Sequence, residues 1–269
     1  MKKALLHAAL IAGGLLTLFP LLWMVAASFM SNGEATTYPP HVLPHAPTFE
    51  QYRELFVRLK ISRAFFSSGT IAVVTTLFSL LFNSMAGYAF AKLRFGGRDR
   101  VFGLLLAALV IPAQVGMLPL FLMMKALGLV NTYWGVIIPS LASVFGIFLI
   151  RQFMLSIPQE LLEAARIDGA GELRIYWSVV MPLARPILAT LAIFTFMTTW
   201  NDFMWPLIVL SDESRYTLPV SLANLVGEHA QDVELMMAGS VVTVLPVLAL
   251  FLFLQRYYIA GLMAGSVKG

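Results

Sequence analysis

Six long apolar segments, separated by shorter polar connections, divide the chain. A helix needs about 20 consecutive apolar residues to cross a bilayer core, and the segments have that length or come close to it. The alternating strands of a membrane barrel would not give such unbroken runs, so the pattern predicts an all-α polytopic membrane protein. We expect one transmembrane domain over residues 1–269, with spans at about 4–30, 64–91, 101–124, 133–150, 183–210 and 236–258.

The first apolar segment follows Lys2 and Lys3 and reaches Ala26-Ala27-Ser28, a pattern that secretory signal peptides share. Its apolar run is about twice as long as the usual signal core, so we interpret it as a retained helix. A mature protein that begins near Ser28 would contradict this interpretation.

The composition indicates that the chain lies in a lipid bilayer rather than in water. Apolar residues make up 59% of the chain and charged residues 12%, whereas ordinary soluble chains carry about 25% charged residues. Too few charged residues are present to cover the surface of a soluble domain. The high apolar content also excludes a disordered chain. The absence of cysteine excludes disulfide scaffolds, thiol catalysis and thiolate metal sites. We also expect no metal site, since four histidines lack ligand-like spacing: His7, His41, His45 and His229.

The distribution of Lys and Arg between the connections predicts the orientation. With the N-terminus inside, twelve of the 18 basic residues face the cytoplasm, so we expect both termini there. Most of the outward basic residues lie between Arg53 and Arg63, in a long connection with a proline-rich first half. In this connection, Thr48 followed by Gln51 is typical of a helix N-terminus, and the helix is expected along the outer interface.

The predicted cytoplasmic connection over residues 151–182 is longer and more patterned than an ordinary connector. Pro158 suits the first turn of a helix, and two glutamates follow where the helix dipole favours negative charge. Gly169 and Gly171 then break the helix, because glycine tolerates a positive φ angle. The pattern predicts a helix-turn-helix, although an interfacial helix that only joins two spans would look the same. Three small residues are expected on its outer face: Ala164, Ala165 and Ala170.

The same connection resembles the EAA loop of ATP-binding-cassette importer permeases. Glu163-Ala164-Ala165 is followed by Gly169 and later by Val179-Val180-Met181-Pro182, where the family pattern ends in Ile-x-Leu-Pro. Val179 and Met181 are conservative apolar departures from that ending. Three longer runs resemble the carbohydrate-uptake branch, of the maltose and glycerol-phosphate type: 157–161, 164–170 and 181–186.

Further matches extend the resemblance over essentially the whole chain. The ending, with Lys268 near the terminus, resembles the six-helix partner of the maltose permease pair more than its longer companion. The matching segments are 19–23, 47–49 with Tyr52, 83–84, 86–90, Trp200-Asn201, 217–220 and 261–269.

The resemblance implies a non-catalytic permease subunit of a binding-protein-dependent importer in a bacterial inner membrane, with a sugar, polyol or sugar-phosphate-like solute as cargo. It also implies a homologous second permease, an extracytoplasmic binding protein, and an ATPase dimer whose closure switches the permease between two states. The chain lacks a Gly-x-x-x-x-Gly-Lys-Ser/Thr phosphate loop, so ATP and Mg are expected on the ATPase and no cofactor here. The residues implied in ATPase coupling are Glu160, Glu163, Ala164, Ala165, Asp168, Gly169 and Gly171.

A sugar cannot cross hydrocarbon, so its pathway needs polar groups within the spans. In the second span, Ser68, Thr75, Thr76, Ser79 and Asn83 share one helical face, which suits either a pathway or helix packing. The fifth span holds the only acidic residue of any predicted span, placed near its outer end beside amide and indole groups that suit a sugar. A kink is expected there at Pro206. The candidate path residues are Ser79, Asn83, Asn201, Asp202 and Trp205.

Other interpretations fit the sequence less well. A secondary transporter driven by an ion gradient would need several intramembrane ionisable residues and often internal repeats, which the sequence lacks. An intramembrane enzyme would need a Ser/His, paired-Asp or His-Glu-x-x-His arrangement within the spans, and none is present. The acidic outer connection over 211–235 is expected to contact a binding protein by resemblance, with a solvated connector as the alternative.

Overall fold

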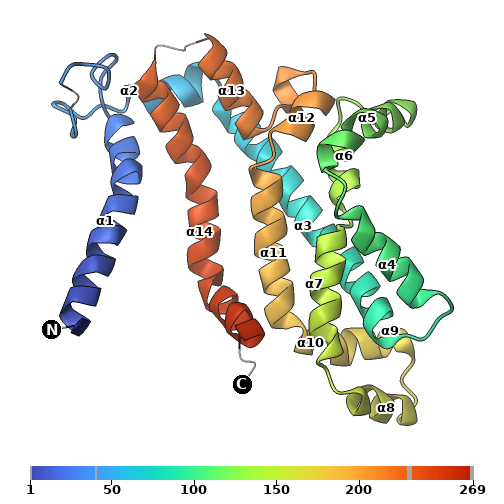
Figure 1. Cartoon of the computed structure of the whole chain (residues 1–269). Coiled ribbons are helices and arrows are strands. Elements are labelled where there is room, and N and C mark those ends of the chain that lie inside the picture. The colour runs from blue at the N-terminus through green and yellow to red at the C-terminus, as the bar shows by residue number, and fades with distance from the viewer. Residues whose placement is uncertain (1, 40, 229–231, 267–269) are drawn as a thin grey trace. The chain divides into compact units, whose positions relative to one another are not determined.

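The computed structural model describes residues 2–39, 41–228 and 232–266, and this part of the chain contains helices and no strand (Figure 1). The all-α class expected from the apolar pattern is therefore confirmed. The chain divides into two compact units, Met1–Phe66 with Tyr216–Leu248 (unit 1) and Ser67–Arg215 with Ala249–Gly269 (unit 2). Of the residues singled out above, His229 and the terminal 267–269 lie outside the described residues.

Three helices are long and apolar enough to cross a membrane on their own: α1 (Lys2–Ala27), α3 (Ile61–Lys92) and α14 (Val233–Ser266). They correspond to the first, second and sixth predicted spans. The third and fourth predicted spans correspond to helix pairs bent at a short break, and the fifth begins with the second half of another bent pair, so the described residues give up to six spans when each pair counts as one.

Each bend lies next to proline, which lacks an N–H for the helical ladder and clashes with the carbonyl four residues earlier. The prolines at the three bends are Pro112, Pro139 and the pair Pro182 and Pro186. The first pair, bent by 96°, is α4 (Arg98–Ala108) with η2 (Ala113–Gly116) and α5 (Met117–Ala126). The second, bent by 40°, is α6 (Tyr133–Ile137) and η3 (Ile138–Ser140) with α7 (Val144–Leu155). The third, bent by 80°, is α9 (Glu172–Ile175), η4 (Tyr176–Val180) and α10 (Met181–Leu183) with α11 (Arg185–Trp200).

The fifth predicted span, 183–210, is interrupted before its outer end. α11 ends at Trp200, and α12 (Met204–Val209) begins after a break. Pro206 lies in the first turn of α12, and a continuous helix would press its ring against the Asp202 carbonyl. The disturbance expected at Pro206 is therefore a break over 201–203, upstream of the proline.

In unit 1, the connection that follows α1 folds back on the start of α14. The buried carboxylate of Glu234 accepts a hydrogen bond from the backbone N–H of Ala35, with 2.7 Å between oxygen and nitrogen. An apolar cluster surrounds this contact and consists of Ala27, Met30 and Ala35 with Trp23, Val233 and Met237. The acidic connection of the sequence contains a short turn, η5 (Glu213–Arg215), and in unit 1 a helix, α13 (Leu218–Glu228).

The helix expected after Thr48 is present as α2 (Glu50–Arg53) and a π-helical turn, η1 (Glu54–Arg58). The expected capping role of Gln51 is wrong. Its side chain is buried, and its amide donates to the Met30 carbonyl at 3.3 Å and to the Asn32 side chain. This glutamine therefore ties the helix to the preceding connection, a long-range contact that a local capping pattern cannot reveal.

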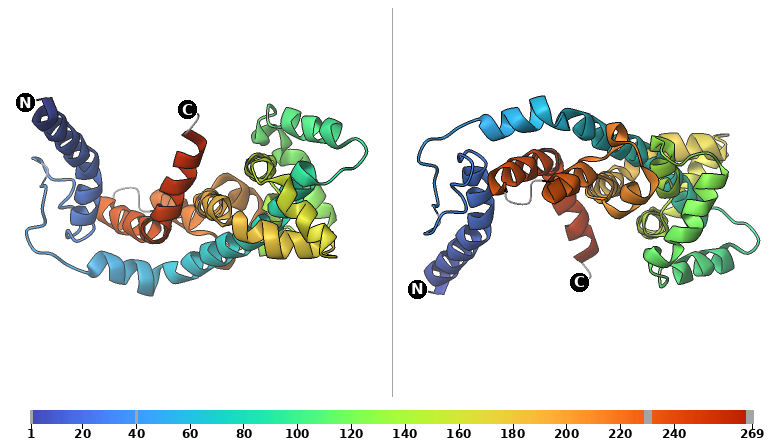
Figure 2. Two further views of the ribbon diagram at one scale, coloured as in Figure 1. Left: turned by 90° about the horizontal axis from the view of Figure 1, so that it is seen from below. Right: turned by 90° about the horizontal axis from the view of Figure 1, so that it is seen from above.

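Helices α3, α7 and α11 supply the core of unit 2, and Figure 2, which views α7 and α11 close to their axes, shows these two side by side. The connection over residues 151–182 packs beneath them through α8 (Gln159–Ile167) and α9, at the lower end of α7 in Figure 1. The fully buried centre of this cluster includes Ile150, Met154, Leu162, Ile175 and Leu191.

Gly87 allows α3 to approach α7 closely. A Cβ atom at this position would lie 2.6 Å from Cγ2 of Ile150, closer than real contacts allow. We expect Gly87→Ala to destabilise the purified chain by about 1–3 kcal/mol, measured as an earlier thermal transition in detergent. Gly69→Ala, in the same helix but with open space around its Cβ, should have a neutral or slightly stabilising effect. Equal transitions for both variants would contradict this packing role.

Candidate functional site

The connection over residues 151–182 contains a short helix, a glycine turn and a second helical piece, as the pattern predicted. Pro158 precedes the first residue of α8, one position earlier than expected. Gly169 has a φ angle of +80°, the left-handed region that favours glycine. The N–H of Gly169 bonds to the Arg166 carbonyl, and the N–H of Ala170 bonds to the Ala165 carbonyl. These two bonds form a Schellman motif, which satisfies the last carbonyls of the helix.

One side of α8 packs against the core and the other is exposed. Leu162 is fully buried, and Ala165 and Ala170 pack against the same cluster. The expectation that all three small residues face outward is therefore wrong for Ala165 and Ala170, because they fill the narrow space beneath α7. The coupling candidates on the exposed side are Glu160, Glu163, Ala164, Asp168, Gly169 and Gly171.

The exposed side of α8 also presents apolar side chains. Ile167 is 87% exposed at the end of the helix, and Leu161 and Leu173 are exposed nearby. Large exposed apolar side chains that lie close together and are surrounded by polar residues mark an interaction site. The exposed side of α8 thus has acidic groups, a small residue and an apolar end, which suits docking of another protein.

A hydrogen bond from Tyr88 holds this connection to the end of α3, and a second bond within the connection fixes the acceptor. The Tyr88 hydroxyl donates to Oε2 of Glu172 at 2.6 Å, and Nε of Arg166 donates to Oε1 of the same carboxylate at 2.8 Å. The guanidinium of Arg166 and the Tyr88 hydroxyl together lower the pKa of Glu172 below its ordinary value, so the carboxylate stays ionised. We call Tyr88, Arg166 and Glu172 the coupling clamp.

Two further contacts strengthen the same junction. The hydroxyls of Ser84 and Tyr176 are 2.7 Å apart, and Nζ of Lys92 donates to the carbonyl of Ile157. Thus α3 is bonded to the segments before and after α8, and we expect the connection and this helix to move as one body. The sequence pattern did not indicate these partners, although Ser84 and Tyr88 lie in segments that carry the family resemblance.

A hollow of about 500 Å³ lies between α3, α11 and the break before α7. Ser79 and Asp202 both line it, so the structure brings together two candidate path residues from distant parts of the sequence. The aromatic rings of Phe145 and Phe194, with centroids 4.9 Å apart, form part of the apolar wall. The remaining hydroxyl-bearing side chains of the lining are Ser140, Ser143, Thr195, Thr198 and Thr199.

The other candidate path residues lie outside the lining of this hollow. Asn83 is buried, and its amide donates to Ser79 at 2.6 Å and accepts from the Ser143 N–H at 3.0 Å. The amide therefore fixes the loop that closes the hollow. Asn201 bonds to the Met197 carbonyl at 2.9 Å, which satisfies the end of α11.

Trp205 is buried, and its indole N–H donates to the Gly135 carbonyl at 3.1 Å. This bond joins α12 to α6, so the indole does not offer a free donor to a solute. The Asp202 carboxylate accepts from the Trp205 backbone N–H at 3.4 Å and thus meets the start of α12. One carboxylate, several hydroxyls and two phenyl rings therefore make up the chemistry of the hollow.

A protein-family model described as "Binding-protein-dependent transport system inner membrane component" matches residues 83–262. The chain is 41% identical over 261 residues to the arabinooligosaccharides transport system permease protein AraQ of Halalkalibacterium halodurans, covering 94% of this chain and 92% of that protein. It is 33% identical to the lactose transport system permease protein LacG of Rhizobium radiobacter over 97% of this chain and 95% of the relative.

Among solved structures, the chain resembles one of a bacterial ABC transporter involved in the import of the acidic polysaccharide alginate. The TM-score is 0.85 at 28% identity, covering 96% of both chains. Sequence and fold thus agree over nearly the whole length with the resemblance found in the connection over 151–182. The chain belongs to the family of binding-protein-dependent transport system inner membrane components, the permease subunits of ABC importers.

Proposed function

We propose that this permease carries a sugar, and that an oligosaccharide is its cargo rather than a polyol or sugar phosphate. The observation that carries the proposal is the 41% identity to a permease named for arabinooligosaccharides, over 94% of the chain. The hollow beside Asp202 supports it, because hydroxyls, a carboxylate and phenyl rings suit the polar and C–H faces of a sugar. Family membership favours an ATP-driven importer over a transporter driven by an ion gradient.

The proposal assigns energy supply to a separate ATPase dimer that docks on the exposed side of α8. A homologous second permease and an extracytoplasmic binding protein complete the proposed complex. Because the ATPase is cytoplasmic, the proposal also assigns the connection over 151–182 and both termini to the cytoplasm. The exposed Ile167 supports such docking, since a large apolar side chain outside the bilayer is stabilised by a partner. No ATP or Mg site is assigned to this chain.

Reconstitution tests the proposed function. Proteoliposomes with the permease pair, its ATPase and its binding protein should take up a labelled arabinooligosaccharide only with ATP inside. Uptake should continue after ionophores collapse the ion gradients. Uptake that stops with the gradient would contradict the energy source, and transport of glycerol phosphate but no oligosaccharide would contradict the cargo.

The hydroxyls of the hollow allow a test of the path. We expect Thr195→Val together with Thr199→Val to raise the KM for sugar uptake, because the nearly isosteric change removes two hydrogen-bonding groups. About threefold to tenfold is expected from one or two lost hydrogen bonds. Thr190→Val, on the same helix but outside the hollow, is the matched control and should transport normally. An unchanged KM in the double variant would exclude this hollow from the path.

A further inference from the structure

The connection between α3 and α4 forms a second hollow, of about 670 Å³. Its lining carries three guanidinium groups and one carboxylate, from Arg94, Arg98, Arg100 and Asp99. We propose that this arginine hollow binds the phosphate headgroup of an anionic phospholipid, whose acyl chains lie along α4. The proposal does not depend on which solute the permease carries.

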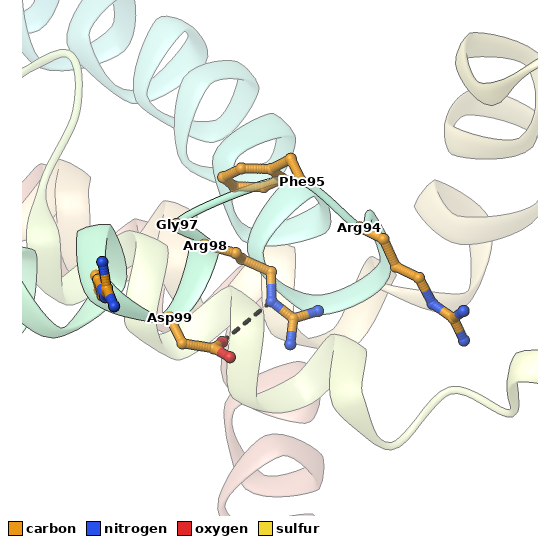
Figure 3. Close-up of a pocket in the computed structure, with 6 residues that line it drawn as sticks. Arg94, Phe95, Gly97, Arg98 and Asp99 are labelled. Carbon is orange, nitrogen blue, oxygen red and sulfur yellow. Dashed lines mark hydrogen bonds and ion pairs between the residues drawn. The ribbon is translucent and has the colours of Figure 1, made fainter.

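The arginines differ in how far they are already engaged. Arg98 donates to Oδ1 of Asp99 at 3.1 Å and to the Leu93 carbonyl at 3.3 Å, and Figure 3 shows its side chain turned toward Asp99. Arg94 and Arg100 are exposed, and neither makes an ion pair within the described part of the chain. Figure 3 shows Arg94 extended away from the loop. Two guanidinium groups are therefore available, and their planar donors match phosphate oxygens.

Arg151 provides an internal contrast. Its guanidinium carbon lies 4.1 Å from the centroid of the Phe102 ring, and its Nε donates to the Phe90 carbonyl at 3.3 Å. These contacts commit Arg151 to packing between α7 and its neighbours. No such contacts hold Arg94 or Arg100 among the residues described, although Arg94 also lines a hollow shared with Glu163 and Glu172.

The hollow is open to a ligand from outside. A Cβ atom built on Gly96 or Gly97 would meet no atom within 4 Å, so the backbone turn itself is uncovered. Gly97 has a φ angle of +78°, which makes glycine the favoured residue at this turn. The Arg98–Asp99 pair is weak competition for a phosphate, because the Asp99 side chain is 76% exposed and surface pairs contribute little.

The surface next to the arginines favours a lipid over a soluble anion or a protein partner. Phe95 is exposed beside Arg94, and Val101 and Leu104 are exposed on α4, directly after the arginines. Leu104 is 73% exposed, and positions 101 and 104 lie on one face of the helix. Arginines at the end of an apolar helix lie at headgroup depth, where anionic lipids attract them. The arginine hollow thus matches the phosphate of a lipid, and the adjoining apolar face of α4 matches its acyl chains.

The proposal is tested on the full-length chain by native mass spectrometry in mixed micelles with phosphatidylglycerol or phosphatidylcholine as the probe. We expect phosphatidylglycerol to be retained preferentially. Arg94→Gln with Arg100→Gln should weaken its retention about tenfold or more, since each basic residue near a membrane surface contributes to attraction. Arg174→Gln with Arg185→Gln removes the same charge from two other exposed positions and should have little effect.

Three results would overturn the proposal. Equal loss in both double variants would indicate general electrostatic attraction. Displacement of the lipid by the same concentration of glycerol phosphate would indicate a site for a soluble phosphate. Unchanged lipid retention with loss of ATPase binding in Arg94→Gln/Arg100→Gln would indicate a protein contact. Thermal transitions of both double variants are measured alongside, so that unfolding is recognised as such.

Discussion

Gly169→Asp should abolish ATP-driven uptake while the protein remains inserted and folded. A residue other than glycine at a φ angle of +80° costs about 1–2 kcal/mol, which a folded membrane protein can tolerate. The new carboxylate would point into open space on the exposed side of α8, since nothing lies within 4 Å of the position. It would add negative charge and bulk to the surface where the ATPase is proposed to dock. Uptake in proteoliposomes and the amount of inserted protein are measured together.

Gly128→Asp is the matched control for this experiment. Gly128 has a φ angle of +70°, open space around its Cβ, and a Schellman motif like that at Gly169. It follows α5, however, and lies outside the connection over 151–182. The two variants should lose similar stability, but only Gly169→Asp should lose uptake. Equal loss of uptake would mean that backbone strain, and not docking, explains the effect. Normal uptake by Gly169→Asp would remove this turn from the coupling path.

The coupling clamp should determine how much solute is moved per ATP. Tyr88→Phe removes the hydrogen bond between α3 and the connection over 151–182, and Glu172→Gln replaces its ionised acceptor with a neutral one, so ATP hydrolysis should continue while uptake per ATP falls. A hydrogen bond to a charged group contributes about 1.5–3 kcal/mol, toward the lower end when partly exposed, so a fall of about tenfold is expected. Because the pKa of Glu172 is lowered in the folded chain, its contribution is present above the ordinary carboxyl pKa and is lost as pH falls.

Tyr133→Phe is the control for the clamp. The Tyr133 hydroxyl lies 2.7 Å from that of Ser67, so this variant also removes a tyrosine hydroxyl that contacts α3. The contact is near the opposite end of the helix, where no coupling role is proposed. Its uptake per ATP should match that of the unmodified complex. A similar loss in both variants, or unchanged stoichiometry in Tyr88→Phe and Glu172→Gln, would exclude the clamp from transmission.

Local patterns predicted the features that depend on neighbouring residues. Long apolar runs indicated the spans, and glycine beside a short amphipathic segment indicated the turn at Gly169. The bends at Pro112 and Pro139 were not predicted, because hydropathy measures solvent preference and ignores the missing N–H of proline. A continuous apolar run can therefore contain two helices at a large angle.

Long-range contacts account for most of the differences at the candidate site. Asn83 bonds to a loop 60 residues away, and Tyr88 bonds to a carboxylate 84 residues away. A helical-face pattern placed Asn83 with the path residues, since polarity alone does not distinguish a solute contact from an internal amide. Ser79 and Asp202, both selected by the requirement for polar groups within the spans, line one hollow, and their role in the path stays a prediction.

The exposed side chain of Ile167 has a consequence for subunit supply in the cell. A copy that lacks the proposed ATPase partner would display this isoleucine to the aqueous phase, where chaperones and proteases act on exposed apolar side chains. Ile167→Ser would remove that signal at its source. In the unmodified chain, by contrast, the lifetime of a copy without its proposed partner would be shorter than that of an assembled copy, so the exposed apolar end of α8 would help to balance the subunits.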